Sequence, residues 1–129
     1  VCENISAGLS KDGFAYVPRK CAEMGDRLLG KQQGAGVRIG GSAQCLLHVA
    51  YHGCLQSYHK INSSFVNHAG YNEWAEANNI VILYPQARAS LVNPKGCWDW
   101  WGYTGKAFAS NVGVQLSTVR NIVRRVLLE

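Results

Sequence analysis

The chain has 129 residues, of which 47% are hydrophobic and 16% are charged, a composition that predicts one globular domain and excludes a disordered chain. No apolar run approaches the ~20 residues of a membrane-spanning helix, so we expect no membrane partner. The net charge is +5, mainly from residues 19–38 and the C-terminal segment, and no nucleic-acid motif accompanies it. We therefore interpret these charges as solvated faces and expect no nucleic-acid partner.

Two short strands are predicted near the N-terminus. Residues 5–9 and 14–17 are apolar runs on either side of Ser-Lys-Asp-Gly at 10–13, and Asp-Gly is a strong hairpin signal. Pro18 ends the second strand. The next stretch, at about 22–44, is rich in Gly and basic residues without a regular period, and it predicts a long exposed loop.

A strand-helix-strand unit follows. Residues 46–51 predict a buried strand that ends in a tight His-Gly-Cys turn at 52–54. Residues 65–79 predict a helix interrupted at Gly70, and 80–84 give the clearest strand pattern in the chain. The expected apolar face of the helix consists of Tyr71, Trp74, Ala75 and Ala77. This order predicts a right-handed parallel crossover.

The last third predicts a loop and then a long helix. Residues 87–110 are rich in Gly, Asn and aromatic residues, whereas 112–128 have helical periodicity. The expected apolar stripe of this helix is Val112, Leu116, Val119, Val123 and Val126. We predict a single α/β domain over 1–129. Ligands of such sheets lie beyond the carboxyl ends of the strands, where the loops at Cys54 and at 97–103 begin.

The five cysteines indicate an oxidising compartment. None forms a C-x-x-C pair, so we expect no zinc site, no other metal and no cofactor. Glycosylation sequons at Asn4 and Asn62 agree with secretion. The chain begins at Val1 without a visible signal peptide, which we interpret as a processed chain or a piece of a longer one. Cys2 is the expected unpaired cysteine.

Four ordered motifs cover much of the chain. They are His-Gly-Cys-Leu-Gln at 52–56, Gly-Tyr-Asn-Glu-Trp-Ala at 70–75, Asn-Ile-Val-Ile-Leu-Tyr-Pro-Gln at 79–86, and Asn-Pro-Lys-Gly-Cys-Trp-Asp-Trp at 93–100. Together they resemble extracellular polyhydroxybutyrate (PHB) depolymerases, most closely the circularly permuted, fungal-type members. The resemblance implies the C-terminal part of an α/β-hydrolase domain. Its expected fold is a partial three-layer sheet with an N-terminal hairpin, the parallel strand-helix-strand unit and the long C-terminal helix.

The resemblance also implies an oxyanion hole. The main-chain N–H of Cys54 would be one donor to the charged oxygen of an ester's tetrahedral intermediate, and Gly53 would allow the sharp turn. An ordinary strand-ending turn is the alternative for the His-Gly pair alone. A second alternative makes Cys54 a thiol nucleophile with His48 or His52 as its base, but strand geometry places the thiol poorly for that role.

The aromatic loop and the cysteines acquire roles from the same resemblance. Trp100 would line a crevice for an apolar polyester or acyl chain, together with Trp101 and Trp98. Because core packing is the alternative for these rings, we expect Trp98 to pack and Trp100 to meet the ligand. Two disulfides are expected. Cys21–Cys45 would close the base of the long loop, and Cys54–Cys97 would fix the oxyanion turn against the aromatic loop.

No nucleophile is expected in this chain. An α/β-hydrolase needs Ser in a G-x-S-x-G elbow between a strand and a helix, followed by an acid and a His. Residues 8–13 approach that pattern, but Asp12 replaces the second Gly and a strand follows, so we interpret Ser10 as a turn residue. Ser42 lacks the following Gly, and Asp99 has no partner for a triad. The histidines that match no catalytic context are His48, His52, His59 and His68.

Three hypotheses about function remain open. The chain is a fragment of a secreted serine esterase that acts on PHB or similar short-chain hydroxyacyl esters, and it is completed by a missing N-terminal part. Alternatively, it is a non-catalytic relative that binds a polyester or glycan through the aromatic crevice. In the third hypothesis it belongs to a feruloyl or acetyl-polysaccharide esterase of the same superfamily.

Overall fold

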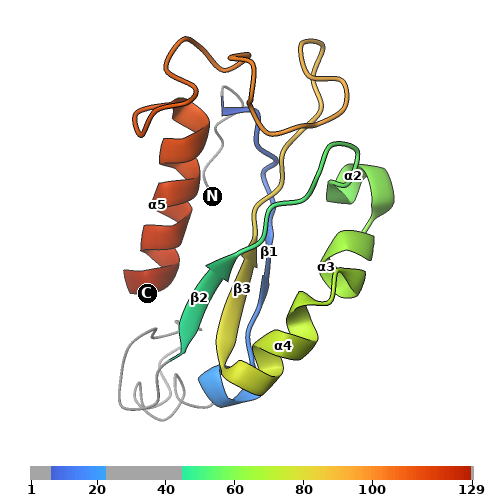
Figure 1. The fold of residues 1–129 in the computed structure, drawn as a ribbon, viewed down its shortest axis with the longest axis vertical. Helices are drawn as coiled ribbons and strands as arrows, with labels where there is room; N and C mark the ends of the chain where they lie inside the picture. Colours follow the sequence, from blue (N-terminus) through green and yellow to red (C-terminus); the bar gives the residue numbers. More distant parts are fainter. Residues whose placement is uncertain (1–6, 23–44, 129) are drawn as a thin grey trace.

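The computed structural model describes residues 7–22 and 45–128 (Figure 1). Predictions for Cys2, Asn4, Ser42 and nearly all of the loop at 22–44 therefore lie outside the described residues. The elements are β1 (Phe14–Tyr16), β2 (Leu46–Val49), α2 (Tyr58–Ile61), α3 (Ser64–His68), α4 (Tyr71–Asn78), β3 (Ile80–Tyr84) and α5 (Val114–Leu128). None of the helices in this described part is long and apolar enough to span a bilayer.

The three strands form one sheet in the order β1-β3-β2. β2 runs parallel to β3, with Leu46 opposite Ile80, and α2, α3 and α4 form the crossover between them. The predicted parallel strand-helix-strand unit is thus confirmed. β3 lies in the centre and is buried from Val81 to Tyr84, which explains why its sequence is a continuous apolar run without alternation.

The N-terminal hairpin is a wrong prediction. β1 pairs antiparallel with β3, with Phe14 opposite Tyr84, and Leu9 forms a bridge to Ala87 beyond the end of β3. Five residue steps separate Leu9 from Phe14 but only three separate Tyr84 from Ala87, so residues 10–13 bulge outward. The Asp-Gly signal therefore marks a bulge in one extended segment. Both parts of this segment pair with the apolar central strand or its continuation, and not with each other.

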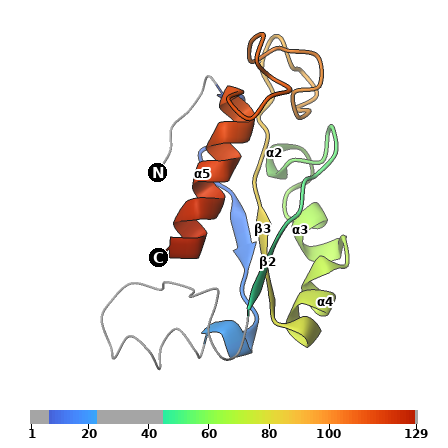
Figure 2. The ribbon, with the colours of Figure 1, turned by 60° about the vertical axis from the view of Figure 1, so that its left-hand side comes forward.

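Helices cover both faces of this sheet. Figure 2 shows α5 on one side and α2, α3 and α4 on the other. Ile82 and Tyr84 pack with Ala75 of α4 on the second side, whereas Val49 packs near Val119 of α5 on the first. The alternation of side chains along the strands thus divides the core into two layers of contacts. The prediction of a mixed α/β fold with a small sheet and helices is confirmed.

The helices begin and end close to their predicted positions, but their buried faces differ. Gly70 has φ 84°, in the left-handed region, and it separates α3 from α4 as predicted. Of the expected apolar face of α4, however, only Ala75 is buried, and the Trp74 side chain is 74% exposed. The predicted face was wrong because this short helix packs against β3 through one small buried residue, Ala75.

The stripe predicted for α5 is also partly wrong. Val119 is buried, but Val112 and Leu116 are exposed, and the polar side chains of Gln115 and Thr118 are buried in their place. Thr118 Oγ1 donates a hydrogen bond to the main-chain oxygen of Val114 at 2.7 Å. Buried polar groups that are fully hydrogen-bonded can replace apolar ones, and a hydrophobicity pattern does not detect them.

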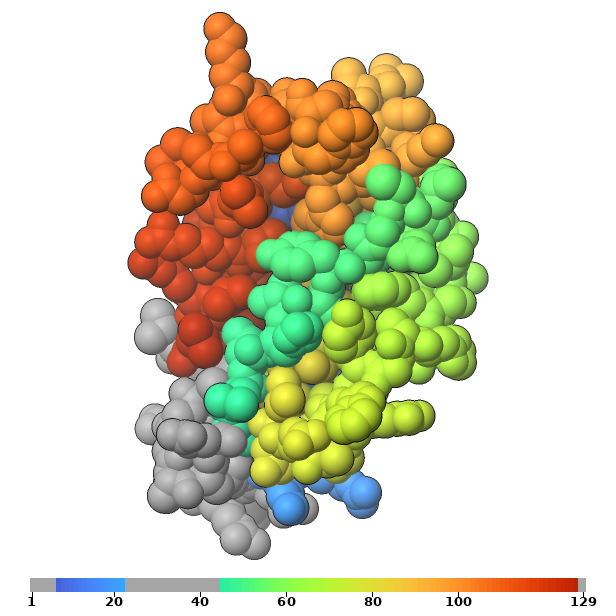
Figure 3. Space-filling view, viewed as in Figure 1, coloured from blue at the N-terminus to red at the C-terminus, as the bar shows by residue number. Residues whose placement is uncertain are grey.

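Among the described residues, the outer strands β1 and β2 each pair with β3 on one side only. The prediction that β2 is a buried strand is wrong, because the residues of β2 alternate between exposed and half-buried, and Leu46 is 56% exposed. Figure 3 shows β2 and the turn after it running across the front of the molecule, between α5 and α4. The free edge of β2 and the turn that follows this strand therefore lie on the same face of the molecule.

Candidate functional site

The turn after β2 leaves one main-chain donor without a partner. The N–H of Gly53 donates to Gln56 Oε1 at 2.8 Å, that of Gln56 to the Gly53 oxygen at 3.1 Å, and that of Leu55 to the Lys95 oxygen at 2.8 Å. Within the described part of the chain, the N–H of Cys54 has no acceptor, and Cys54 is an exposed residue. Within residues 53–56, the N–H of Cys54 is thus the one without an internal acceptor.

The local backbone explains the residue types in this turn. A Cβ built on Gly53 would lie 2.8 Å from Gln56 Oε1, so a side chain there would displace the amide that holds the turn closed. Leu55 has φ 63°, in the left-handed region that favours glycine. The strain at Leu55 was not visible in the sequence, and strained backbone of this kind concentrates at functional sites.

His52 connects three segments at this edge of the sheet. Its side chain is buried, and Nε2 accepts the N–H of Ala87 at 3.0 Å, so Nδ1 carries the proton and donates to the Gly53 oxygen at 2.7 Å. Trp98 Nε1 donates to the His52 main-chain oxygen at 2.9 Å. Burial lowers the pKa of His52, although its bond to Gly53 opposes the shift. Both ring nitrogens are engaged, so His52 has a structural role.

Both predicted disulfides are present in the structure. Cys21 is bonded to Cys45, and Cys54 is bonded to Cys97. The hypothesis that Cys54 is a thiol nucleophile is therefore wrong, because its sulfur is already in a covalent bond. Asn93 holds Cys97 from the other side, since its Oδ1 accepts the Cys97 N–H at 2.9 Å and its Nδ2 donates to the Cys97 oxygen at 2.8 Å.

Asp99 organises the aromatic loop. Its carboxylate accepts main-chain N–H bonds from Trp101, Gly102, Tyr103 and Thr104, and the Thr104 hydroxyl bond measures 2.6 Å. Burial alone would raise the pKa of Asp99, but these hydrogen bonds outweigh it and leave the pKa below its ordinary value. Sequence reasoning had found no role for Asp99; a carboxylate followed by a Trp-Gly-Tyr-Thr loop was the available signal.

Gln115 joins the first turn of α5 to the same loop. Its Oε1 accepts the Asp99 N–H at 2.7 Å, and its Nε2 donates to the Ala7 oxygen at 2.9 Å and the Tyr103 hydroxyl at 3.0 Å. The sequence pattern did not reveal this buried amide, because a polar residue in an amphipathic helix is expected on the exposed face. It positions the aromatic loop against the helix.

The tryptophans of the loop divide into packed and exposed rings, as expected. Trp98 is half-buried and contacts the rings of Tyr51 and His52, with centroids 4.8 and 5.4 Å away. Trp100 is 74% exposed and lies edge-on to Trp101, with centroids 5.3 Å apart. The loop therefore presents two aromatic rings to solvent, and their role toward a ligand stays a prediction.

The structure brings together one pair that sequence reasoning kept apart. Ser10 Oγ lies 3.2 Å from His59 Nε2, at the bulge of residues 10–13. Over the described ranges, no carboxylate forms a hydrogen bond with His59, and Ser10 does not stand between a strand and a helix. The pair consequently lacks the third member and the elbow of a hydrolase triad.

The remaining histidines lie apart from one another. His48 stacks on Tyr71, with ring centroids 5.4 Å apart, and His68 is exposed on α3. In residues 7–22 and 45–128, no three His, Cys, Asp or Glu side chains gather closely enough to hold a metal ion.

The comparisons with known proteins give one consistent result. No family model matches the chain. The poly(3-hydroxybutyrate) depolymerase of Delftia acidovorans is 38% identical over 92% of this chain, and the polyhydroxybutyrate depolymerase of Talaromyces funiculosus is 38% identical over 93%. This chain spans only 20% and 34% of their respective lengths.

Solved structures agree with these relatives. The PHB depolymerase from Penicillium funiculosum matches 93% of this chain with a TM-score of 0.76 and 38% identity, and the match spans 36% of that protein. A PHB depolymerase complexed with an R3HB trimer matches the same share with a TM-score of 0.74 and 37% identity. The resemblance found in the sequence motifs is thereby confirmed.

The buried His52 predicts that the chain loses stability in mild acid. The unfolded chain binds a proton near the ordinary pKa of 6.5, but the folded chain binds it only at lower pH. The free energy of unfolding should therefore fall as the pH drops below about 7. Urea unfolding of wild type and His52→Gln measures this effect. The Gln variant should be less stable near neutral pH but less sensitive to acid, and an equal pH slope in both proteins would contradict the assignment.

The carboxylate of Asp99 predicts a second effect on stability. Asp99→Asn keeps the size of the side chain but removes the charge that accepts the loop N–H bonds, and we expect a loss of about 1–3 kcal/mol near neutral pH. Glu73→Gln, on the exposed surface of α4, is the matched control and should change stability little. Urea unfolding followed by tryptophan fluorescence distinguishes the two, and equal midpoints for both variants would refute the loop-organising role.

Proposed function

From the likeness to PHB depolymerases along nearly the whole chain, we propose that this chain supplies the oxyanion turn and one crevice wall of a secreted serine esterase that acts on PHB. The observation that carries the proposal is the unpartnered N–H of Cys54, in a turn where the N–H groups of Gly53, Leu55 and Gln56 have internal acceptors. A free, immobilised donor beyond the carboxyl end of a parallel strand suits an oxyanion hole.

The chemistry of ester cleavage explains why such a donor matters. When a serine oxygen attacks the ester carbonyl carbon, the carbonyl electron pair moves to oxygen and leaves a negative charge there. The Cys54 N–H would stabilise this oxygen, and loss of one such donor costs roughly 3–4 kcal/mol in other hydrolases. The disulfide to Cys97 and the bond from Leu55 to Lys95 hold the donor still, so no reorganisation is needed during the reaction.

The nucleophile and its base belong, in this proposal, to the part of the relatives that this chain does not span. The chain covers about a third of the fungal depolymerases and a fifth of the bacterial one. The open edge of β2 lies directly before the oxyanion turn, so further parallel strands could be added there. A serine following such a strand would approach Cys54 from the carboxyl end of the same sheet.

The aromatic loop suits a polyester substrate. Trp100 and Trp101 expose rigid apolar faces, whereas Trp98 packs against His52. Leu55, 46% exposed, adds an aliphatic surface beside Cys54. One related structure holds an R3HB trimer, which is a short polyester of the class that we propose here. The two disulfides suit an extracellular enzyme.

A non-catalytic polyester-binding role is the second candidate. It is favoured by the exposed rings of Trp100 and Trp101 together with the incomplete Ser10–His59 pair. A glycan ligand or a feruloyl or acetyl-polysaccharide substrate receives no support from the relatives, whose names specify PHB.

The proposal predicts that the chain alone does not turn over esters. A short-chain chromogenic ester incubated with the folded chain should release product no faster than buffer does, because in this proposal the nucleophile lies in the part of the relatives that this chain does not span. Ser10→Ala should behave like wild type. Turnover that disappears in Ser10→Ala would show that Ser10 and His59 form a working nucleophile and base, and it would overturn this part of the proposal.

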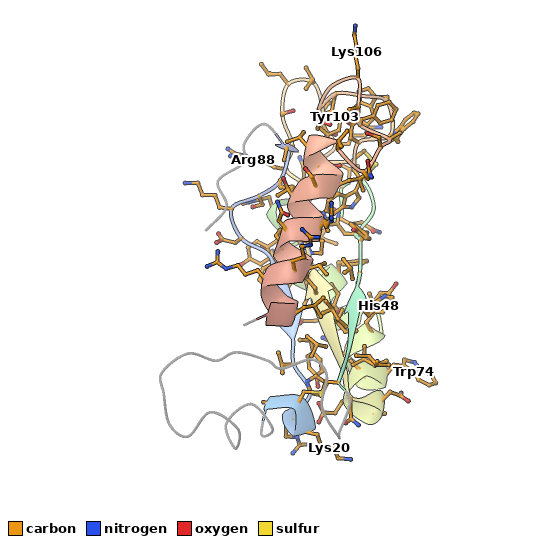
Figure 4. All side chains as sticks on the ribbon, turned by 90° about the vertical axis from the view of Figure 1, so that its left-hand side faces the viewer. Lys20, His48, Trp74, Arg88, Tyr103 and Lys106 are labelled. Atoms are coloured by element: carbon orange, nitrogen blue, oxygen red, sulfur yellow. A yellow bond between two sulfur atoms is a disulfide. The ribbon has the colours of Figure 1, made fainter. Side chains whose placement is uncertain are left out.

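Binding to the polyester gives a separate prediction. The chain should be retained on PHB granules, and Trp100→Ala should reduce retention several-fold because it removes an exposed aromatic face. Trp74→Ala is a matched control, since Trp74 is equally exposed at 74% but lies on α4, toward the opposite end of the molecule from the aromatic loop (Figure 4). Equal retention of the two variants in a pull-down assay would argue against an aromatic crevice at Trp100.

A further inference from the structure

A hollow with several basic side chains has none of the residues of the oxyanion turn in its lining. It has a volume of about 410 Å³, within the range of small-molecule sites. Its lining includes Ser10, Lys11, Asp12, His59, Lys60 and Arg88. These residues come from the bulge at 10–13, from α2, and from the segment after β3, and none of them takes part in the proposed ester cleavage.

Hydrogen bonds fix the three walls relative to one another. The N–H of Ser10 donates to the Gln86 oxygen at 2.8 Å, and that of Arg88 donates to the Gly8 oxygen at 2.8 Å. Gln86 Oε1 accepts the N–H of Tyr58 at 2.8 Å, which anchors the start of α2 beside the same segment. Because Gln86 is buried and its hydrogen bonds join two of the walls, the fold itself fixes the shape of the hollow.

Charge and polar groups converge on this hollow. Lys60 and Arg88 each bring a positive charge to the hollow, and the carboxylate of Asp12 is the acidic group in its lining. Among the residues that the structure describes, neither Lys60 nor Arg88 forms an ion pair with a carboxylate. We propose that this hollow binds the anionic oxygens of a small organic acid, a carboxylate or a phosphate, between the cations of Lys60 and Arg88.

The contact between Ser10 and His59 fits this role better than a catalytic one. As a nucleophile and base the pair would need an acid hydrogen-bonded to His59, and none is present over the described ranges. As ligands of an anion they need no third member: when His59 Nε2–H donates to Ser10 Oγ, the serine hydroxyl can donate its own hydrogen to an anion. Their 3.2 Å separation brings the wall formed by the bulge into contact with the wall formed by α2.

The test is an NMR titration of the ¹⁵N-labelled chain with inorganic phosphate and, separately, with acetate, at constant ionic strength maintained by chloride. We expect saturable shifts of the main-chain amides of Ser10, Lys11 and Asp12 with at least one of the two probes. The probe that saturates at lower concentration identifies the anion class. Higher salt should weaken the binding, because the cations are exposed.

Matched variants make the test specific. Lys60→Ala and Arg88→Ala remove exposed side chains and should each weaken binding about tenfold, which corresponds to one charge-assisted contact. Lys106→Ala removes the same charge from the tip of the aromatic loop, where Figure 4 shows Lys106 pointing away from the molecule, and should leave the affinity unchanged. Absence of saturable shifts with both probes, or equal weakening in Lys106→Ala, would overturn the proposal.

Discussion

The carboxyl edge of the sheet depends on the buried imidazole of His52. A neutral imidazole has one donor and one acceptor. Here Nδ1 donates to the turn after β2, and Nε2 accepts the N–H of Ala87 after β3. Its main-chain oxygen adds Trp98 of the aromatic loop. The Cys54–Cys97 disulfide joins the turn and the aromatic loop covalently as well. The turn that contains the free N–H of Cys54 is therefore held in place both by the hydrogen bonds of His52 and by the disulfide.

Much of this arrangement was predictable because its signals are local or strongly patterned. The continuous apolar run at 80–84 identified β3, and Gly70 marked the break between two helices. Both disulfides and the division between Trp98 and Trp100 followed from the resemblance and are present in the structure. Features of this kind depend on residue type and order more than on tertiary contacts.

Several features that sequence reasoning missed depend on distant partners. The segment before Phe14 looked like a hairpin strand, but Leu9 forms its bridge to Ala87, after the end of β3. Trp74 was expected in the core and is exposed, because Ala75 alone seats α4. The contacts made by Gln115 bring together positions as far apart as 7 and 115. A polar residue in an apolar stripe shows its purpose only when its hydrogen-bond partners are known.

The central claim is that the N–H of Cys54 is the one unsatisfied donor in a rigid turn, and amide hydrogen exchange measures this most directly. Exchange followed by NMR on the folded chain should show slow exchange for the N–H groups of Gly53, Leu55 and Gln56, which have internal acceptors. The Cys54 N–H should exchange much faster than these three. Protection of Cys54 equal to that of its neighbours would mean that its N–H is already bonded, and the oxyanion assignment would then be wrong.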